Sequence, residues 1–153
     1  MYRHPAAWYP AAIRTFLRFE YYYRRHIIQL DERTARHDPE LLYTLRPGQF
    51  IFSNVEYSTP YVVNSLGVRD DERSLAQPEI VVVGDSYAMG WGVQQSESFP
   101  EVLERRTGRR VLNAAVASYG TVREMRLLGR IDLSRTTTLI VQYCANDRER
   151  RAC

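Results

Sequence analysis

The sequence predicts an α/β protein built on a parallel sheet, and three observations lead to this fold class. Strand-like apolar runs at 79–83, 111–116 and 136–144 alternate with two helix-like segments. The order strand, helix, strand, helix, strand is typical of βαβ units, whose strands run parallel beneath covering helices. The runs also lack period-two alternation, which predicts strands that are buried on both faces.

Two segments precede the sheet, so we divide the chain into residues 1–30, 31–78 and 79–153. Within the first, residues 10–30 place apolar side chains near helical spacing and predict an amphipathic helix. Two interpretations stay open: a helix packed on the domain surface, or an interfacial helix in weak contact with a membrane surface, where arginines and aromatics suit the headgroup region.

The middle segment is a turn-rich β extension. Its prolines and glycines interrupt two short β-like runs, "QFIFS" at 49–53 and "YVVN" at 61–64. These runs predict a short β-hairpin and no separate hydrophobic core.

The two helices of the sheet region have recognisable ends. The first is expected at 99–107, with Gly108 as its stop. The second starts before the turn near Gly129. A capping box is predicted at each start, formed by Ser98 with Glu101 and by Thr121 with Glu124.

Composition excludes several classes of protein. The 153 residues carry a net charge of +3, which is too small for a nucleic-acid footprint. The two cysteines, Cys144 and Cys153, provide neither a disulfide framework nor metal-ligand spacing. The printed chain shows no signal peptide and no apolar run long enough to span a membrane, so as written it is expected to be cytoplasmic.

Small or hydrogen-bonding residues follow all three predicted strands. Gly84, Asp85 and Ser86 follow the first, residues 117–120 the second and residues 144–147 the third. Ligands of open parallel sheets bind outside the carboxyl ends of the strands. These loops are therefore the candidate functional site.

Acyl transfer to a serine needs a hydroxyl on a tight turn and hydrogen-bond donors aimed at the developing oxyanion. Ser86 has the position of the nucleophile. Its own backbone N–H, the N–H near Ser118 and the side-chain amide of Asn146 are the candidate donors. Gly84 would let the backbone turn without a Cβ clash.

Three blocks, "VVVGDSYAMGWGV", "NAAVASYG" and "YCAND", together resemble the SGNH hydrolase family, also called GDSL esterases. The upstream "NSLGVRDDE" resembles the segment that precedes the first block in bacterial members. The resemblance implies a flavodoxin-like sheet, here with three strands of an incomplete α/β/α sandwich. It implies Ser86 as nucleophile, Ser86, Ser118 and Asn146 as oxyanion-hole residues, and Gly84, Asp85 and Asp147 as supporting residues.

The chain departs from the family in three places. Ser118 and Cys144 stand where the family has glycines, and no D-x-x-H block supplies the histidine base and its aspartate. His4, His26 and His37 all precede the sheet, and we expect them to be surface residues. We therefore interpret the chain as the front part of a longer hydrolase, whose third strand is an apolar edge open to self-association.

Three functions stay open at this point. The first is a serine esterase acting on a small-molecule, lipid or glycan ester. The second is a glycan O-acetyltransferase that uses the same serine, and the third is a non-catalytic binding module. No metal or organic cofactor is expected, because the nucleophile and its donors come from the protein. Nucleotide-binding glycine motifs and the G-x-S-x-G elbow are absent from the sequence.

Overall fold

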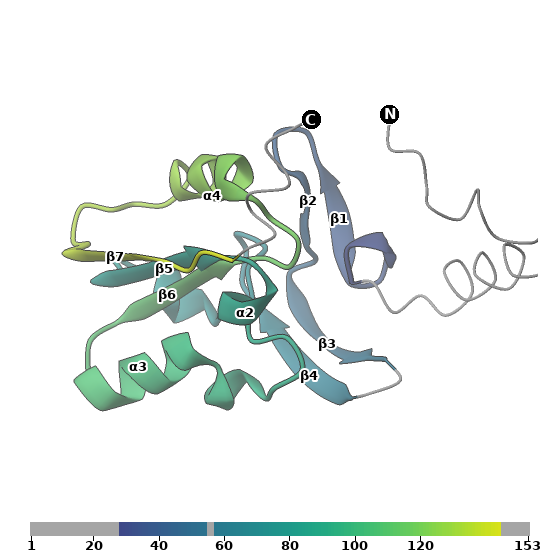
Figure 1. Cartoon of the computed structure of the whole chain (residues 1–153), viewed down its shortest axis with the longest axis horizontal. Helices are drawn as coiled ribbons and strands as arrows, with labels where there is room; N and C mark the ends of the chain where they lie inside the picture. Colours follow the sequence, from purple (N-terminus) through teal and green to yellow (C-terminus); the bar gives the residue numbers. More distant parts are fainter. Residues whose placement is uncertain (1–27, 55–56, 145–153) are drawn as a thin grey trace, which may run out of the picture.

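The computed structural model describes residues 28–54 and 57–144 of the chain (Figure 1). At its centre lies a three-stranded parallel sheet in the order β6-β5-β7. The strands are β5 (Ile80–Gly84), β6 (Val111–Ala115) and β7 (Thr138–Val141). The predicted class, mixed α/β with a parallel sheet, is confirmed.

Strand β7 is shorter than the predicted 136–144. Before the strand, the hydroxyl of Thr136 donates to the carbonyl of Pro78 at 2.8 Å. After it, the side chain of Gln142 turns toward the loop that follows β5, where its Oε1 accepts from the backbone N–H of Asp85. These side-chain bonds add to the backbone hydrogen bonds that Thr137 and Gln142 make with the β5 chain just outside the strand.

Helices α3 (Phe99–Thr107) and α4 (Thr121–Leu128) cover opposite faces of this sheet (Figure 1). Helix α3 has the predicted bounds, and Gly108 ends it in the left-handed conformation with φ 67°. A short helix, α2 (Ser86–Met89), follows β5 where the sequence predicted a loop.

Both predicted capping boxes are wrong. The hydroxyl of Ser98 donates to the carbonyl of Gln95 at 2.9 Å and makes no cap bond to α3. The N-cap of α4 is Gly120, so Thr121 is already helical, and no side chain caps this helix. A capping box does occur between Gln94 and Glu97, at the short 3₁₀ helix η4 (Gln95–Glu97).

Two antiparallel hairpins precede the sheet. Strands β3 (Gly48–Ser53) and β4 (Ser58–Val63) pair where the sequence predicted the hairpin. Strands β1 (Ala35–Asp38) and β2 (Leu42–Leu45) form a second hairpin that the sequence did not predict.

The missed hairpin depends on an aspartate turn. Asp38 Oδ1 accepts from the backbone N–H groups of Glu40 and Leu41, at 3.0 and 2.8 Å, and Leu42 takes a positive φ of 69°. Pro39 and the charges of this stretch obscured the two short strands. The predicted helix at 10–30 lies outside the described residues, except for the short 3₁₀ helix η2 (Ile28–Leu30).

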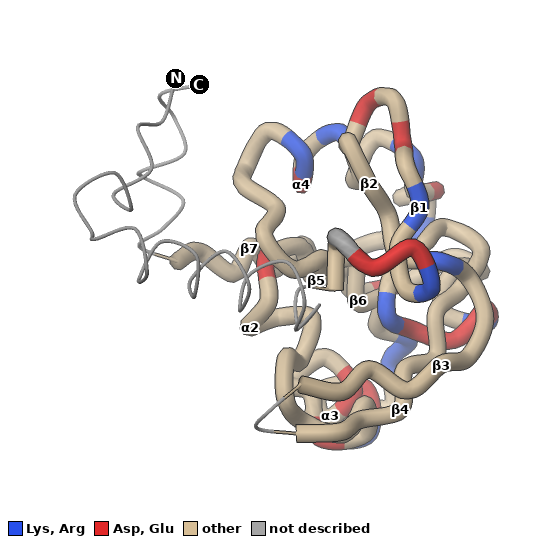
Figure 2. Tube along the Cα trace, turned by 90° about the vertical axis from the view of Figure 1, so that its right-hand side faces the viewer, with Lys and Arg blue, Asp and Glu red and all other residues tan. Residues whose placement is uncertain are grey.

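The hairpins and the sheet share one hydrophobic core. Ile28, Leu41 and Tyr61 from the hairpin segment are fully buried in the same cluster as Val81 and Leu112 from the sheet. The tube in Figure 2 shows no charged residue along strands β3 to β7; the charges lie on β1, in helices and in connections. No helix within the described ranges is long and apolar enough to cross a membrane.

Candidate active site

Ser86 stands at the carboxyl end of the central strand of the sheet. Strand β5 ends at Gly84, Asp85 is the N-cap of α2, and Ser86 is the first helical residue. The Ser86 side chain is half-buried. Its backbone N–H belongs to the first turn of α2, where N–H groups have no intrahelical acceptor. A hydroxyl and a backbone donor thus lie together at the edge where open sheets bind ligands.

The hydrogen bonding of Asp85 explains why an aspartate precedes Ser86. Its carboxylate accepts from the backbone N–H of Tyr87 at 3.0 Å, and its side chain is almost fully buried. This is the structural role of an N-cap, which fixes the start of the helix. Asp85 therefore orients the Ser86 turn, while the adjacent Ser86 remains accessible.

Gln142 is a second support of the turn, and sequence reasoning missed it. Its Oε1 accepts from the backbone N–H groups of Asp85 and Ala88, each at 3.2 Å. Gly84 is needed for this close approach: a Cβ there would lie 2.7 Å from Gln142 Oε1 and 3.0 Å from the Ala88 Cβ. The reason for the glycine is thus packing against β7, since Gly84 does not have a positive φ.

The loop after β6 begins beside the Ser86 turn, because the N–H of Val116 donates to the carbonyl of Gly84 at 3.2 Å. Ser118 in this loop has φ 64°, a left-handed conformation that favours glycine. Ser118 is the position at which the SGNH resemblance predicts glycine. The backbone geometry therefore suits the block even though the residue type departs from it.

The first hairpin and the short helix η2 that precedes it hold the Ser118 loop in place. Gln29 Nε2 donates to Ser118 Oγ at 3.1 Å, and the hydroxyl of Tyr43 donates to the carbonyl of Ala117. In return, the hydroxyl of Tyr119 donates to the carbonyl of Tyr43, and the two rings meet edge to face with centroids 5.4 Å apart. The extension thus contributes to the geometry of the candidate site.

The third strand leads to the same edge, since the N–H of Gln142 donates to the carbonyl of Val83 at 2.9 Å. Cys144 is a half-buried cysteine two residues further along. Asn146 and Asp147, the predicted oxyanion-hole and supporting residues of this strand end, lie outside the described residues.

A hollow of about 470 Å³ opens beside Ser86. Its walls include the aromatic side chains of Tyr87, Trp91 and Phe99. Trp91 packs against Phe52 of β3, with ring centroids 5.1 Å apart. The second hairpin therefore supports one wall of the hollow, a role that the sequence pattern did not reveal.

Arg69 supports the chain that follows α2 and was also missed by sequence reasoning. It is 1% exposed, and its guanidinium donates to the carbonyls of Pro60, Met89, Gly90 and Val93. The guanidinium carbon lies 3.8 Å from the centre of the Tyr61 ring, a cation–π contact. Arg69 is the arginine of "NSLGVRDDE". A lone arginine in a turn gives no indication in the sequence that it is buried.

Asp70 ties the same turn to β6. Its Oδ2 accepts from the backbone N–H of Asn113 at 2.8 Å, and its Oδ1 accepts from that of Asp71. Burial raises the pKa of Asp70 to about 7, and the two backbone hydrogen bonds only partly oppose this. The carboxyl group is therefore neutral in mildly acidic solution.

His37, the histidine within the described ranges, is exposed on β1 and does not line the hollow beside Ser86. The residues that the structure describes also contain no cluster of histidine, cysteine or carboxylate side chains able to hold a metal ion.

Compared with known proteins, the chain matches no family model and no curated protein.

Proposed function

We propose that the chain carries the nucleophile region of an SGNH-type serine hydrolase that acts on esters. The observation that carries the proposal is the placement of Ser86: first residue of a helix, at the carboxyl end of the central parallel strand, beside an open hollow. The positive φ of Ser118 at the position of the family's glycine supports it.

The proposed reaction forms a covalent acyl-serine. Ser86 Oγ attacks the ester carbonyl carbon, its proton passes to a base, and the C–O bond to the alcohol breaks as the alcohol takes up a proton. Water then cleaves the acyl-serine and releases the acid. The backbone N–H groups of Ser86 and Ser118 and the Asn146 amide would stabilise the oxyanion. Asp147 would support the third strand end.

The strand order is compatible with a flavodoxin-like sheet. The order β6-β5-β7 corresponds to the segment 2-1-3 of the flavodoxin-like order 2-1-3-4-5. In such a sheet a further strand would pair with β7. The apolar, partly exposed surface of β7, where Leu139 is 45% and Val141 is 46% exposed, fits that arrangement.

The aromatic wall of the hollow favours an ester with an apolar or sugar-ring portion. Lipid esters and glycan esters both meet this description, and transfer of an acetyl group to a glycan would use the same Ser86 chemistry. The second candidate, a non-catalytic binding module, is favoured by one observation: among the described residues no histidine lines the hollow.

The test is covalent labelling of the purified chain with a fluorophosphonate probe, together with turnover of p-nitrophenyl acetate. We expect labelling of wild type and none of Ser86→Ala, with Ser96→Ala as control because Ser96 is an exposed serine nearby. Without a base, an oxyanion hole alone leaves about 10³-fold catalysis over water. Equal labelling of wild type and Ser86→Ala would contradict the esterase and favour the binding module.

A further inference from the structure

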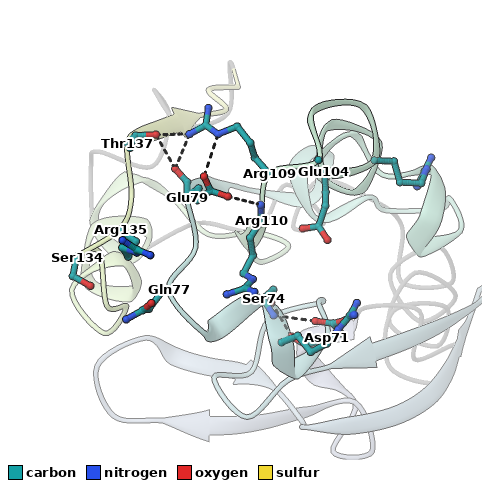
Figure 3. A pocket seen from close by; sticks show the side chains of 13 residues that line it. Asp71, Ser74, Gln77, Glu79, Glu104, Arg109, Arg110, Ser134, Arg135 and Thr137 are labelled. Carbon is teal, nitrogen blue, oxygen red and sulfur yellow. Dashed lines mark hydrogen bonds and ion pairs between the residues drawn. The ribbon is translucent and has the colours of Figure 1, made fainter.

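A second hollow, of about 940 Å³, opens at the opposite edge of the sheet from Ser86 (Figure 3). Residues that precede the strands line it: Glu79 lies before β5, Arg110 before β6 and Thr137 before β7. The amino ends of parallel strands meet at one edge, so this hollow is separate from the candidate active site.

Positive charge dominates the lining of this hollow. Five arginines and three carboxylates contribute to it. The arginines come from four places in the chain: the 3₁₀ helix η3 (Glu72–Leu75), helix α3, the α3–β6 connection and the α4–β7 connection. They are Arg73, Arg105, Arg109, Arg110 and Arg135.

All three carboxylates are already engaged. Asp71 caps η3 by accepting from the N–H of Ser74 at 2.9 Å, and it also pairs with Arg73. Glu104 accepts from the backbone N–H of Val111 at 2.7 Å.

Glu79 is engaged on both oxygens. Its Oε2 accepts from the backbone N–H of Arg110 at 3.2 Å, and its Oε1 lies 3.7 Å from Arg109 Nε. Figure 3 shows both contacts. The carboxylates therefore hold local backbone and two of the five guanidinium groups.

Three guanidinium groups have no ion pair with any described carboxylate. Arg105 donates to the carbonyl of Ser96, and Arg110 donates to the carbonyl of Ala76. The guanidinium of Arg135 is exposed and makes no hydrogen bond with the described residues. In Figure 3, Arg135 lies on one side of the hollow and Arg110 extends toward its middle. An anion held between them would supply the missing negative charge.

The neutral lining residues narrow the class of ligand. Ser74, Gln77, Ser134 and Thr137 offer hydroxyl and amide groups, and none of the described lining residues is aromatic. A nucleobase would have no ring to stack on, whereas sugar hydroxyls would find hydrogen-bond partners. Planar guanidinium groups match phosphate oxygens. The volume is within the range of small-molecule sites, about 300–1,000 Å³.

We propose that this hollow binds a small polyhydroxylated phosphate ester, of the sugar-phosphate class, with Arg110 and Arg135 on its phosphate groups. The site does not depend on Ser86 chemistry. Because Arg110 and Arg135 are exposed, binding weakens as salt screens them.

The test is calorimetric titration of the whole chain with fructose 1,6-bisphosphate at low salt, with inorganic phosphate and unphosphorylated fructose as comparison ligands. We expect saturable one-to-one binding of the bisphosphate, weaker binding of inorganic phosphate and none of fructose. Arg135→Gln should raise the Kd about tenfold, the loss typical of one charge-assisted contact. Ser86→Ala should bind like wild type.

Arg106→Gln is the matched control, since Arg106 is exposed on α3 and does not line the hollow. It removes the same charge, so the Kd should change less than about twofold. If Arg106→Gln weakened binding of the bisphosphate as much as Arg135→Gln, the loss would be due to net surface charge, and the proposed site would be wrong. Equal affinity for inorganic phosphate and the bisphosphate would overturn the ligand class, and absence of saturable binding would overturn both. Folding of Arg135→Gln is checked by its thermal midpoint.

Discussion

Strands β6 and β7 flank the same central strand in parallel, yet their surroundings differ. All five residues of β6 are buried, whereas the residues of β7 alternate between half-buried and exposed. The buried Arg69–Asp70 turn also supports the β6 side through Asn113. We call β5, β6 and this turn the inner side of the sheet, and β7 its outer strand.

The difference teaches that an apolar run predicts a strand but does not predict whether other parts of the protein bury that strand. Residues 136–144 were expected to be buried on both faces like the other two strands, and this expectation is wrong for the described part of β7. Leu139, Val141 and Tyr143 are between 45% and 47% exposed. The prediction that the third strand presents an apolar edge agrees with this exposure, while self-association through it remains a proposal.

The largest effect is expected from Arg69→Met on the inner side. The substitution leaves four carbonyls without their donor, and unsatisfied buried groups cost about 1–3 kcal/mol each when no water reaches them. We expect the free energy of unfolding to fall by about 4 kcal/mol, measured by urea denaturation. Arg135→Met, beside the outer strand, should change it by less than about 0.5 kcal/mol. Similar losses would erase the distinction between the two sides.

A matched pair of leucines tests the two strands directly. Leu112 of β6 is fully buried, whereas Leu139 of β7 is 45% exposed. Leu112→Ala should lower the free energy of unfolding by about 3 kcal/mol through lost burial and a cavity. Leu139→Ala should lower it by less than about 1 kcal/mol. A large loss for Leu139→Ala would mean that β7 is covered in solution, for example by a second copy.

Gly84→Ala tests the contact by which the outer strand supports the Ser86 turn. The added Cβ would meet Gln142 and Ala88, and we expect a loss of about 2 kcal/mol, in the range of overpacking. Shortening the neighbour in Gly84→Ala/Gln142→Ala should cost less than the sum of the single changes. Strict additivity in denaturation experiments would argue against the Gln142 contact.

Asp70→Asn tests the pH dependence of the inner side. The pKa of Asp70 is about 7 in the folded chain against 3.8 for the ordinary group, so its contribution is full below pH 3.8 and is lost as the pH rises through 7. The slope of unfolding free energy against pH, at most about −1.4 kcal/mol per unit for one group, should become flatter between these values. Asp132→Asn, an exposed control, should leave the slope unchanged; an unchanged slope in Asp70→Asn would contradict the raised pKa.

The smallest effect is expected at Ser118. Ser118→Ala loses the hydrogen bond from Gln29 but keeps the left-handed backbone, so it should cost about 1 kcal/mol. Ser118→Gly loses the same bond but relieves the backbone strain, so its cost should be below about 0.5 kcal/mol. If glycine destabilised the fold more than alanine in thermal unfolding, the strained conformation would be absent in solution.

Local pattern was sufficient for much of the fold. Apolar runs and glycine stops predicted β5, β6, α3 and the β3–β4 hairpin, because these signals depend on residues near one another in the chain. The same reasoning placed Ser86 at the end of the first sheet strand. The predicted capping boxes were wrong for two local reasons. The Ser98 hydroxyl is bonded to the carbonyl of Gln95, and the N-cap of α4 is Gly120, one residue before Thr121.

The sequence by itself thus determined the fold class, the order of the sheet strands along the chain and the position of Ser86 directly after β5. Only the tertiary structure decided what holds the Ser86 turn and the chain that follows α2: Gln142 reaches back 57 residues to Asp85, and Arg69 reaches carbonyls up to 24 residues away. The tertiary structure also decided that β6 is buried while β7 is partly exposed, and it brought arginines from four places in the chain around one hollow. Such contacts depend on how distant segments pack, and a polar residue in a turn carries no local sign of its distant partner.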